Sequence, residues 1–147
     1  MSSGESEFRP AHVIRLRGPW RWEAQGSAVK AEGEAALTGP IPIDWRAVWG
    51  TRFAGRIRAC RAFGRPTGLS PGDRVDLVIE SGGWAGVAEL NGQYLARVTA
   101  EEGLARVGVR ELLAPRNQLM IEISLPDPDR AVSDWLDFNV RLEIGEA

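Results

Sequence analysis

The sequence predicts an all-β domain, a β-sandwich or a barrel, and three observations support this fold class. Apolar and polar side chains alternate in Val75–Ile79 and again in Leu119–Ile123, which is the period of strands with one buried face. Asn91-Gly92 separates two apolar runs, and this dipeptide favours a type I′ hairpin turn, in which both central residues have positive φ. Short strand-like segments with turn residues between them, about ten in all, fill the chain without a long helix.

The other strands follow from the same alternation and from the residues that break it. His12–Arg17 is expected to be a strand with Ile14 and Leu16 on one face. Trp20–Trp22 is expected to open a second strand, with both tryptophans packed in the core, and Ser27–Glu32 to be a weaker third. Further strands are expected at Thr51–Phe63, Leu104–Val109 and Phe138–Ile144, with a short helical turn at Glu111–Ala114.

Gly39–Gly50 is expected to be an insert that carries one helical turn. Its two prolines exclude a central strand. Asp44 is a good N-cap, and Gly50 suits the end of the turn. Trp45 and Trp49 stand four residues apart and therefore share one side of this turn.

Length, composition and charge indicate one globular domain and exclude several classes of protein. The chain has 147 residues, 44% hydrophobic and 26% charged, with a net charge of −2. A nucleic-acid-binding domain usually has a basic excess, and no apolar run approaches the roughly 20 residues of a membrane span. We therefore expect neither nucleic acid nor membrane as a partner. Residues 1–11 are expected to be a flexible leader and residues 12–147 a single domain.

The N-terminal segment and the scarcity of Cys and His restrict location and chemistry. No basic, apolar signal segment begins the sequence, which favours a cytoplasmic location. Cys60 is the only cysteine and His12 the only histidine. One chain therefore cannot form an intrachain disulfide or a zinc site of several His and Cys ligands, and no nucleophilic triad is expected.

Four segments occur in an order and spacing that resemble one known family. They are Leu16–Trp22, Arg74–Glu80, Glu89–Leu95 and Val109–Ile123. Together they resemble the N-terminal sugar-binding domain of glycoside hydrolase family 2, over residues 12–145. The resemblance implies a jelly-roll β-sandwich of the galactose-binding-like fold. It also implies a sugar ligand without catalysis, because hydrolysis in that family belongs to a Glu pair of a separate barrel.

The sequence departs from the family pattern at four positions. Glu89 stands where an aromatic residue is usual, and Gly108 and Arg110 replace the usual Asp and Thr. Arg116 replaces the Gly before the final Asn of the motif. These changes leave the scaffold intact and weaken the transfer of any particular sugar contact.

The predicted ligand-binding residues are three tryptophans and two polar partners. Sugar rings stack their C–H faces on aromatic planes, while their hydroxyls bind Arg, Asp and Asn. An exposed tryptophan on the insert or beside the Gly82-Gly83 turn would supply such a plane. The residues expected to bind the ligand are Trp45, Trp49, Trp84, Arg56 and Asp134.

Each of these residues also has a structural interpretation. The tryptophans, Trp135 among them, would anchor loops to the sandwich, and Arg56 and Arg58 would lie on a solvated face paired with Asp76 and Glu80. The alternative function is therefore a protein-interaction or self-assembly module without a sugar ligand, because Trp and Arg are also enriched in interface hot spots. An enzyme of unknown type is a third interpretation.

The acidic loop that begins at Pro126 raises the question of a metal ion. Calcium binds several carboxylate and carbonyl oxygens, and jelly-roll carbohydrate modules often hold one. The spacing matches no EF-hand loop, so no cofactor is expected, and calcium stays the alternative. Its carboxylates would come from Asp127, Asp129, Asp134 and Asp137.

Overall fold

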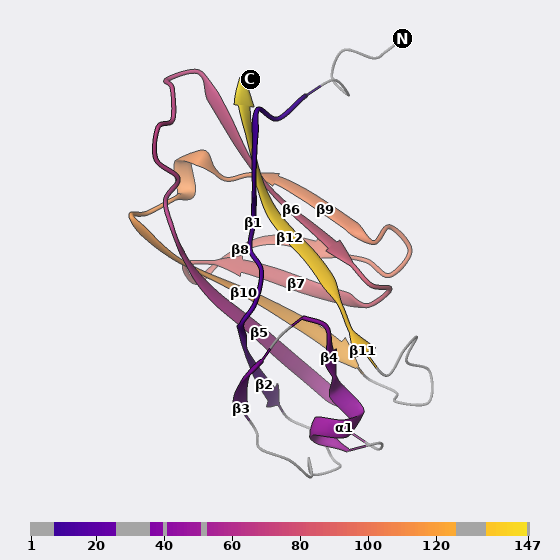
Figure 1. Ribbon diagram of the computed structural model, residues 1–147. Coiled ribbons are helices and arrows are strands. Elements are labelled where there is room, and N and C mark those ends of the chain that lie inside the picture. Colours follow the sequence, from indigo (N-terminus) through magenta and orange to yellow (C-terminus); the bar gives the residue numbers. More distant parts are fainter. Residues whose placement is uncertain (1–7, 26–35, 40, 51–52, 126–134, 147) are drawn as a thin grey trace.

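The computed structural model describes residues 8–25, 36–39, 41–50, 53–125 and 135–146, which form a β-sandwich (Figure 1). One sheet has four strands in the order β1-β12-β6-β9, and the other has six in the order β3-β2-β5-β10-β7-β8. A two-stranded ribbon, β4 with β11, lies at the end of the sandwich that also carries the helix α1 (Figure 1). The predicted all-β fold class is confirmed.

The four-stranded sheet is antiparallel, and its inner face lines the core. Val75, Leu77 and Ile79 are each 1% exposed, which confirms the predicted inward row of β6. Leu142 of β12 stands opposite Leu77 and is equally buried. The strands of this sheet are β1 (His12–Arg15), β12 (Phe138–Glu146), β6 (Asp73–Ser81) and β9 (Leu104–Gly108).

The six-stranded sheet supplies the opposite wall of the core. Leu119, Ile121 and Ile123 of β10 are 0% exposed, so the second predicted inward row is confirmed. The strand β10 pairs antiparallel with β5 on one side and β7 on the other. The strands of this sheet are β3 (Ala36–Gly39), β2 (Trp20–Gln25), β5 (Gly55–Gly64), β10 (Arg116–Leu125), β7 (Ala85–Leu90) and β8 (Gln93–Val98).

The Asn-Gly dipeptide makes the predicted hairpin turn between β7 and β8. Asn91 has φ 53° and Gly92 has φ 84°, the positive values that a type I′ turn requires. The Asn91 side chain also accepts a 2.8 Å hydrogen bond from the Gln118 backbone and donates one of 3.1 Å to Asn117. The turn residues therefore hold the hairpin against β10, which supports their structural interpretation.

The insert forms the helical turn that its sequence predicts. The helix α1 (Trp45–Trp49) follows β4 (Ile43–Asp44), and Asp44 accepts a 3.1 Å hydrogen bond from the Ala47 amide. Gly50 ends the helix with φ 100°, a conformation that glycine adopts without strain. A second short turn, η2 (Arg110–Leu112), precedes β10 near its predicted place. No helix in the described ranges is long and apolar enough to cross a bilayer.

Several segments differ from the prediction or lie beyond what the structure describes. Ile14 is 39% exposed although Leu16 on the same face is buried, because β1 ends its sheet and Ile14 lies at the rim. Within the predicted leader, the Arg74 guanidinium lies 4.2 Å from the Phe8 ring centroid, and the Ala11 amide donates to the chain at Ile144. The predicted strand at Ser27–Glu32 lies outside the described residues. The ribbon of β4 with β11 (Trp135–Leu136) was not predicted.

Candidate functional site

The two tryptophans of the insert lie in the core instead of facing solvent. Trp45 and Trp49 are both 0% exposed, so the expected exposure of these rings is wrong. They share one side of α1, as predicted, but that side packs onto the sandwich. The Trp49 ring centroid lies 6.1 Å from that of Phe53, and the Arg46 guanidinium lies 4.9 Å from the Trp45 ring. A short amphipathic helix is stable only when its apolar side is covered, which explains the burial.

Trp84 is buried as well, at 6% exposure, which contradicts its expected place beside solvent. Its indole Nε1 donates a 2.8 Å hydrogen bond to the Asp137 carbonyl oxygen, and its ring meets Phe138 edge-on at 5.9 Å. Trp20 and Trp22 pack around the same Phe138 ring, at 4.9 Å and 5.6 Å. The rings of these three tryptophans thus pack around Phe138, the first residue of β12, and hold the start of this strand in place.

Of the two predicted polar partners, the structure describes only Arg56, which does not join these tryptophans. Arg56 is exposed on β5 and pairs with Glu122 of β10 at 3.5 Å, and Arg58 pairs with the same carboxylate at 3.0 Å. The expected pairing with Asp76 and Glu80 is wrong, because those residues lie in the other sheet. Asp134, like most of the predicted calcium loop, lies outside the described residues. The described ranges hold no cluster of three or more His, Cys, Asp or Glu suited to a metal ion.

Trp135 is the tryptophan that the structure exposes, at 52% of its surface, whereas the other five are buried. Exposure alternates along Trp135, Leu136, Asp137 and Phe138, so Trp135 and Asp137 share the outward side. The flanking Leu136 pairs with Ile43 of β4 and is buried. Residues 135–137 therefore present one aromatic ring and one carboxylate to solvent, next to Leu136, which is held in the ribbon.

Two adjacent grooves are lined by Asp137, and Trp135, two residues before it, lines neither of them. One, of about 330 Å³, is lined by Arg15, Arg17, Ile41 and residues 137–139. The other, of about 260 Å³, is lined by Glu80, Ser81 and the same residues 137–139. The Asp137 carbonyl oxygen between them accepts hydrogen bonds from Trp84 and from the Gly82 amide. The arrangement offers carboxylate, amide and guanidinium groups around a shallow concave surface.

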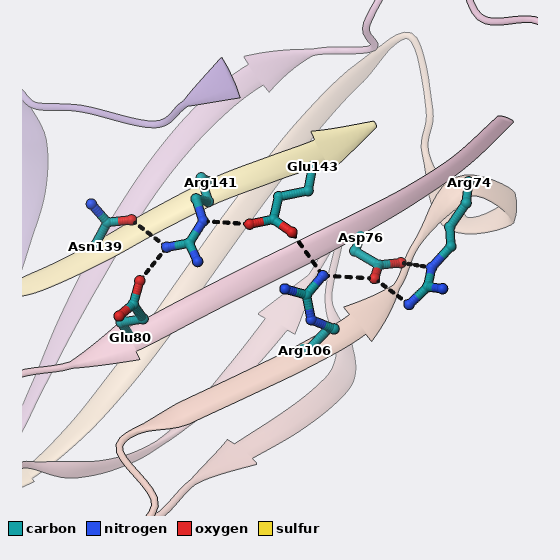
Figure 2. A network of polar contacts seen from close by, with 7 residues as sticks. All are labelled: Arg74, Asp76, Glu80, Arg106, Asn139, Arg141 and Glu143. Atoms are coloured by element: carbon teal, nitrogen blue, oxygen red, sulfur yellow. Dashed lines mark hydrogen bonds and ion pairs between the residues drawn. The ribbon is translucent and has the colours of Figure 1, made fainter. Parts of the chain in front are cut away.

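The outer face of the four-stranded sheet carries a network of ion pairs next to these grooves (Figure 2). Asp76 is 1% exposed and accepts two hydrogen bonds from Arg74, at 2.9 Å and 2.7 Å, and one from Arg106 at 3.0 Å. Burial alone raises the pKa of Asp76, but the hydrogen bonds and charges of the two guanidiniums outweigh it and lower this pKa below its ordinary value.

Glu143 of β12 continues the network toward the grooves. It pairs with Arg106 at 2.8 Å and with Arg141 at 2.7 Å, and Arg141 also binds Glu80 and the Asn139 side chain. Burial alone raises the pKa of Glu143, but the hydrogen bonds and charges of Arg141 and Arg106 outweigh it. The pKa of Glu143 is therefore lower than its ordinary value. Asn139, which lines both grooves, is thereby held by Arg141 (Figure 2).

The grooves bring together residues that the sequence did not single out as binding residues. For Arg15 and Arg17 the sequence showed only that they stand two positions apart in a predicted strand and so share one face. For Asn139 it showed no feature that indicates binding. Asp137 was considered only as a calcium ligand. These four residues meet because β1 pairs with β12, and local sequence patterns do not encode this contact between residues 126 to 132 positions apart.

Comparisons with known proteins agree with this architecture. No family model matches the sequence, and no curated protein matches it. A β-glucuronidase from Bifidobacterium dentium, complexed with coumarin-3-O-glucuronide, is 16% identical with a TM-score of 0.72, over 92% of this chain and 30% of that one. A β-glucuronidase from Ruminococcus gnavus, in complex with D-glucuronic acid, is 13% identical with a TM-score of 0.69, over 95% and 30%.

A third solved structure shows the same partial coverage. It is an FMN-binding β-glucuronidase from Faecalibacterium prausnitzii L2-6, 19% identical with a TM-score of 0.68, over 89% of this chain and 22% of that one. The chain therefore spans 22–30% of the length of these β-glucuronidases. In fold, this chain is a β-sandwich that resembles the N-terminal domain of family 2 glycoside hydrolases.

Proposed function

We propose that this chain is a non-catalytic carbohydrate-binding module whose ligand stacks on Trp135 and extends into the two grooves that Asp137 lines. The observation that carries the proposal is that Trp135, 52% exposed, shares its outward side with Asp137, which borders both grooves. An exposed aromatic ring supplies the stacking plane for a sugar, and the Asp137 and Asn139 side chains supply partners for its hydroxyls. The resemblance to a domain of family 2 glycoside hydrolases favours the same function by analogy.

A catalytic role has less support from the described residues. Hydrolysis of a glycosidic bond by paired carboxylates needs one that is protonated near neutral pH. The two buried carboxylates, Asp76 and Glu143, have pKa values below their ordinary ones because arginines bind them. They are therefore ionised and engaged at neutral pH, which suits a structural role.

The Trp135→Ala variant tests the proposed site. It is expected to weaken sugar binding by about tenfold or more, because loss of one stacking aromatic costs roughly 1.5 kcal/mol. The measurement is a glycan-array screen of the wild-type chain, followed by calorimetric titration of the best ligand into both proteins. Tyr94→Ala is the matched control, since Tyr94 is 64% exposed on β8 of the other sheet, and it should bind normally. Wild-type silence across the array would remove the proposal, and normal binding by Trp135→Ala would remove this site.

One observation favours the alternative function of self-association. Val13 and Ile14 are 44% and 39% exposed on β1, which ends its sheet, beside a groove of about 600 Å³ that Pro66 and Leu69 also line. An exposed apolar edge strand can pair with another strand.

Under this alternative, analytical ultracentrifugation is expected to show a dimer, and Val13→Asp should weaken its formation by about tenfold, because a charge on an edge strand opposes strand pairing. Leu112→Asp, an equally exposed leucine on η2, is the control and should leave the dimer unchanged. A wild-type chain that stays monomeric at the highest concentrations examined would exclude the self-association alternative.

A further inference from the structure

The basic side of the groove of about 330 Å³ is formed by two arginines whose guanidiniums bind no other described residue. Arg15 and Arg17 are exposed, and both line this groove. Neither guanidinium makes a hydrogen bond or an ion pair within the described ranges. The three arginines of the neighbouring network, in contrast, all bind carboxylates: Arg74, Arg106 and Arg141.

The two arginines are aimed in the same direction by the strand pairing. Arg15 stands opposite Arg141 on β12, and the Leu16 amide donates a 2.9 Å hydrogen bond to the Val140 carbonyl oxygen, which continues the pairing. Arg15 and Arg17 therefore alternate to the outer face of the sheet, with their Cα atoms roughly 7 Å apart. Arg61 donates a 2.6 Å hydrogen bond to the Arg17 carbonyl oxygen and fixes the backbone there. One anionic group fits between two guanidiniums at this spacing.

The nearest buried carboxylates do not neutralise this pair. Asp76 and Glu143 are 1% and 7% exposed, and their oxygens already accept hydrogen bonds from the network arginines (Figure 2). On the opposite side of residues 137–139, the exposed Glu80 and Asp137 line the second groove. The site is thus cationic where Arg15 and Arg17 lie, while Glu80 is paired with Arg141 and Asp137 lies between the two grooves that it lines.

We propose that this site selects a saccharide that bears an anionic group, a carboxylate or a sulfate, which Arg15 and Arg17 bind while Asp137 and Asn139 accept and donate hydrogen bonds at the hydroxyls. This inference rests on the proposed carbohydrate-binding function and adds the charge of its ligand. Arginine suits the role because its planar fork donates two parallel hydrogen bonds to a carboxylate or a sulfate.

The test compares saccharides that differ only in charge. Calorimetric titrations use an α-1,4-linked galacturonate trisaccharide, the same trisaccharide with its carboxylates reduced to hydroxymethyl groups, and that reduced form sulfated at O6. Polyglutamate of similar charge serves as a polyanion without sugar. The proteins are the wild-type chain, Arg15→Gln/Arg17→Gln, and Arg97→Gln as a matched control, an exposed arginine on β8 of the other sheet.

Wild type and Arg97→Gln are expected to bind one of the two charged trisaccharides at least about tenfold more tightly than the reduced one. The double variant should lose this difference while its affinity for the reduced trisaccharide stays the same. The charged trisaccharide that binds more tightly identifies the selected group as a carboxylate or a sulfate. Equal affinity for charged and reduced forms overturns the inference and leaves the proposed function in place, and so does competition by polyglutamate at equal charge. Absence of binding by all three trisaccharides overturns the inference, and the glycan-array screen of the wild-type chain then decides the proposed function separately.

Discussion

Trp49→Ala is expected to lower the free energy of unfolding by about 3–5 kcal/mol, the usual cost of truncating a large buried aromatic residue. Trp49 is 0% exposed, and its ring packs against Phe53. Its loss leaves a cavity between α1 and the sandwich, and the short helix loses half of the apolar side that holds it there. Urea denaturation followed by tryptophan fluorescence measures the change in midpoint at constant m-value.

The matched control for this experiment is Trp135→Ala, which removes the same side chain from an exposed position. Its free energy of unfolding is expected to change by less than about 1 kcal/mol, because exposed substitutions rarely cost more. The two variants separate stability from binding. If Trp49→Ala left the unfolding midpoint unchanged and abolished sugar binding, the assignment of Trp49 to the core would be wrong.

Acid is expected to destabilise this protein by protonating the carboxylates of the network on the outer face of the four-stranded sheet. Asp76 and Glu143 have pKa values in the folded state below their ordinary values of 3.8 and 4.5. A carboxyl group with a lowered pKa stabilises the fold fully above its ordinary pKa, and this contribution is lost as the pH falls through the lower folded value. Above pH 4.5, these two groups should therefore leave the free energy of unfolding constant. As the pH falls below 4.5, the free energy of unfolding should decrease.

Asp76→Asn assigns this acid sensitivity to a residue. The amide keeps the shape but carries no charge, and it accepts at one oxygen where the carboxylate accepts three hydrogen bonds. The variant is expected to lose about 2 kcal/mol of stability at pH 7, a value reduced because the two guanidiniums are partly exposed. Its loss of stability in acid should be smaller than that of wild type. An Asp76→Asn profile identical to wild type would contradict the assignment.

The elements that the sequence predicted correctly are those whose signal is local. The inward rows of β6 and β10 follow from alternation, the β7–β8 turn follows from the backbone freedom of Asn and Gly, and α1 follows from the Asp44 cap. Each depends on residues a few positions apart, so no knowledge of the partner element was needed.

The site was predicted less well because exposure is a property of the assembled layers. Trp45, Trp49 and Trp84 stand in loops or short elements, where the sequence suggests exposure to solvent, yet all three side chains are buried in the core. The predicted ion pairs of Arg56 and Arg58 were wrong for the same reason. Asp76 meets Arg106, 30 residues away along the chain, whereas Arg58 meets Glu122, which is 64 residues away. Strand order decides these pairs, and strand order is a global result.

By itself, the sequence determined that this chain folds as antiparallel strands with two apolar rows facing each other, because side-chain alternation has only one period that buries them. The tertiary structure alone decided which tryptophan faces solvent and which arginines bind no carboxylate among the residues that the structure describes. Both depend on which strands become neighbours, since burial and ion pairing are set by atoms that approach in space from distant parts of the chain. Trp135, Arg15 and Arg17 take their place at the candidate site through that packing.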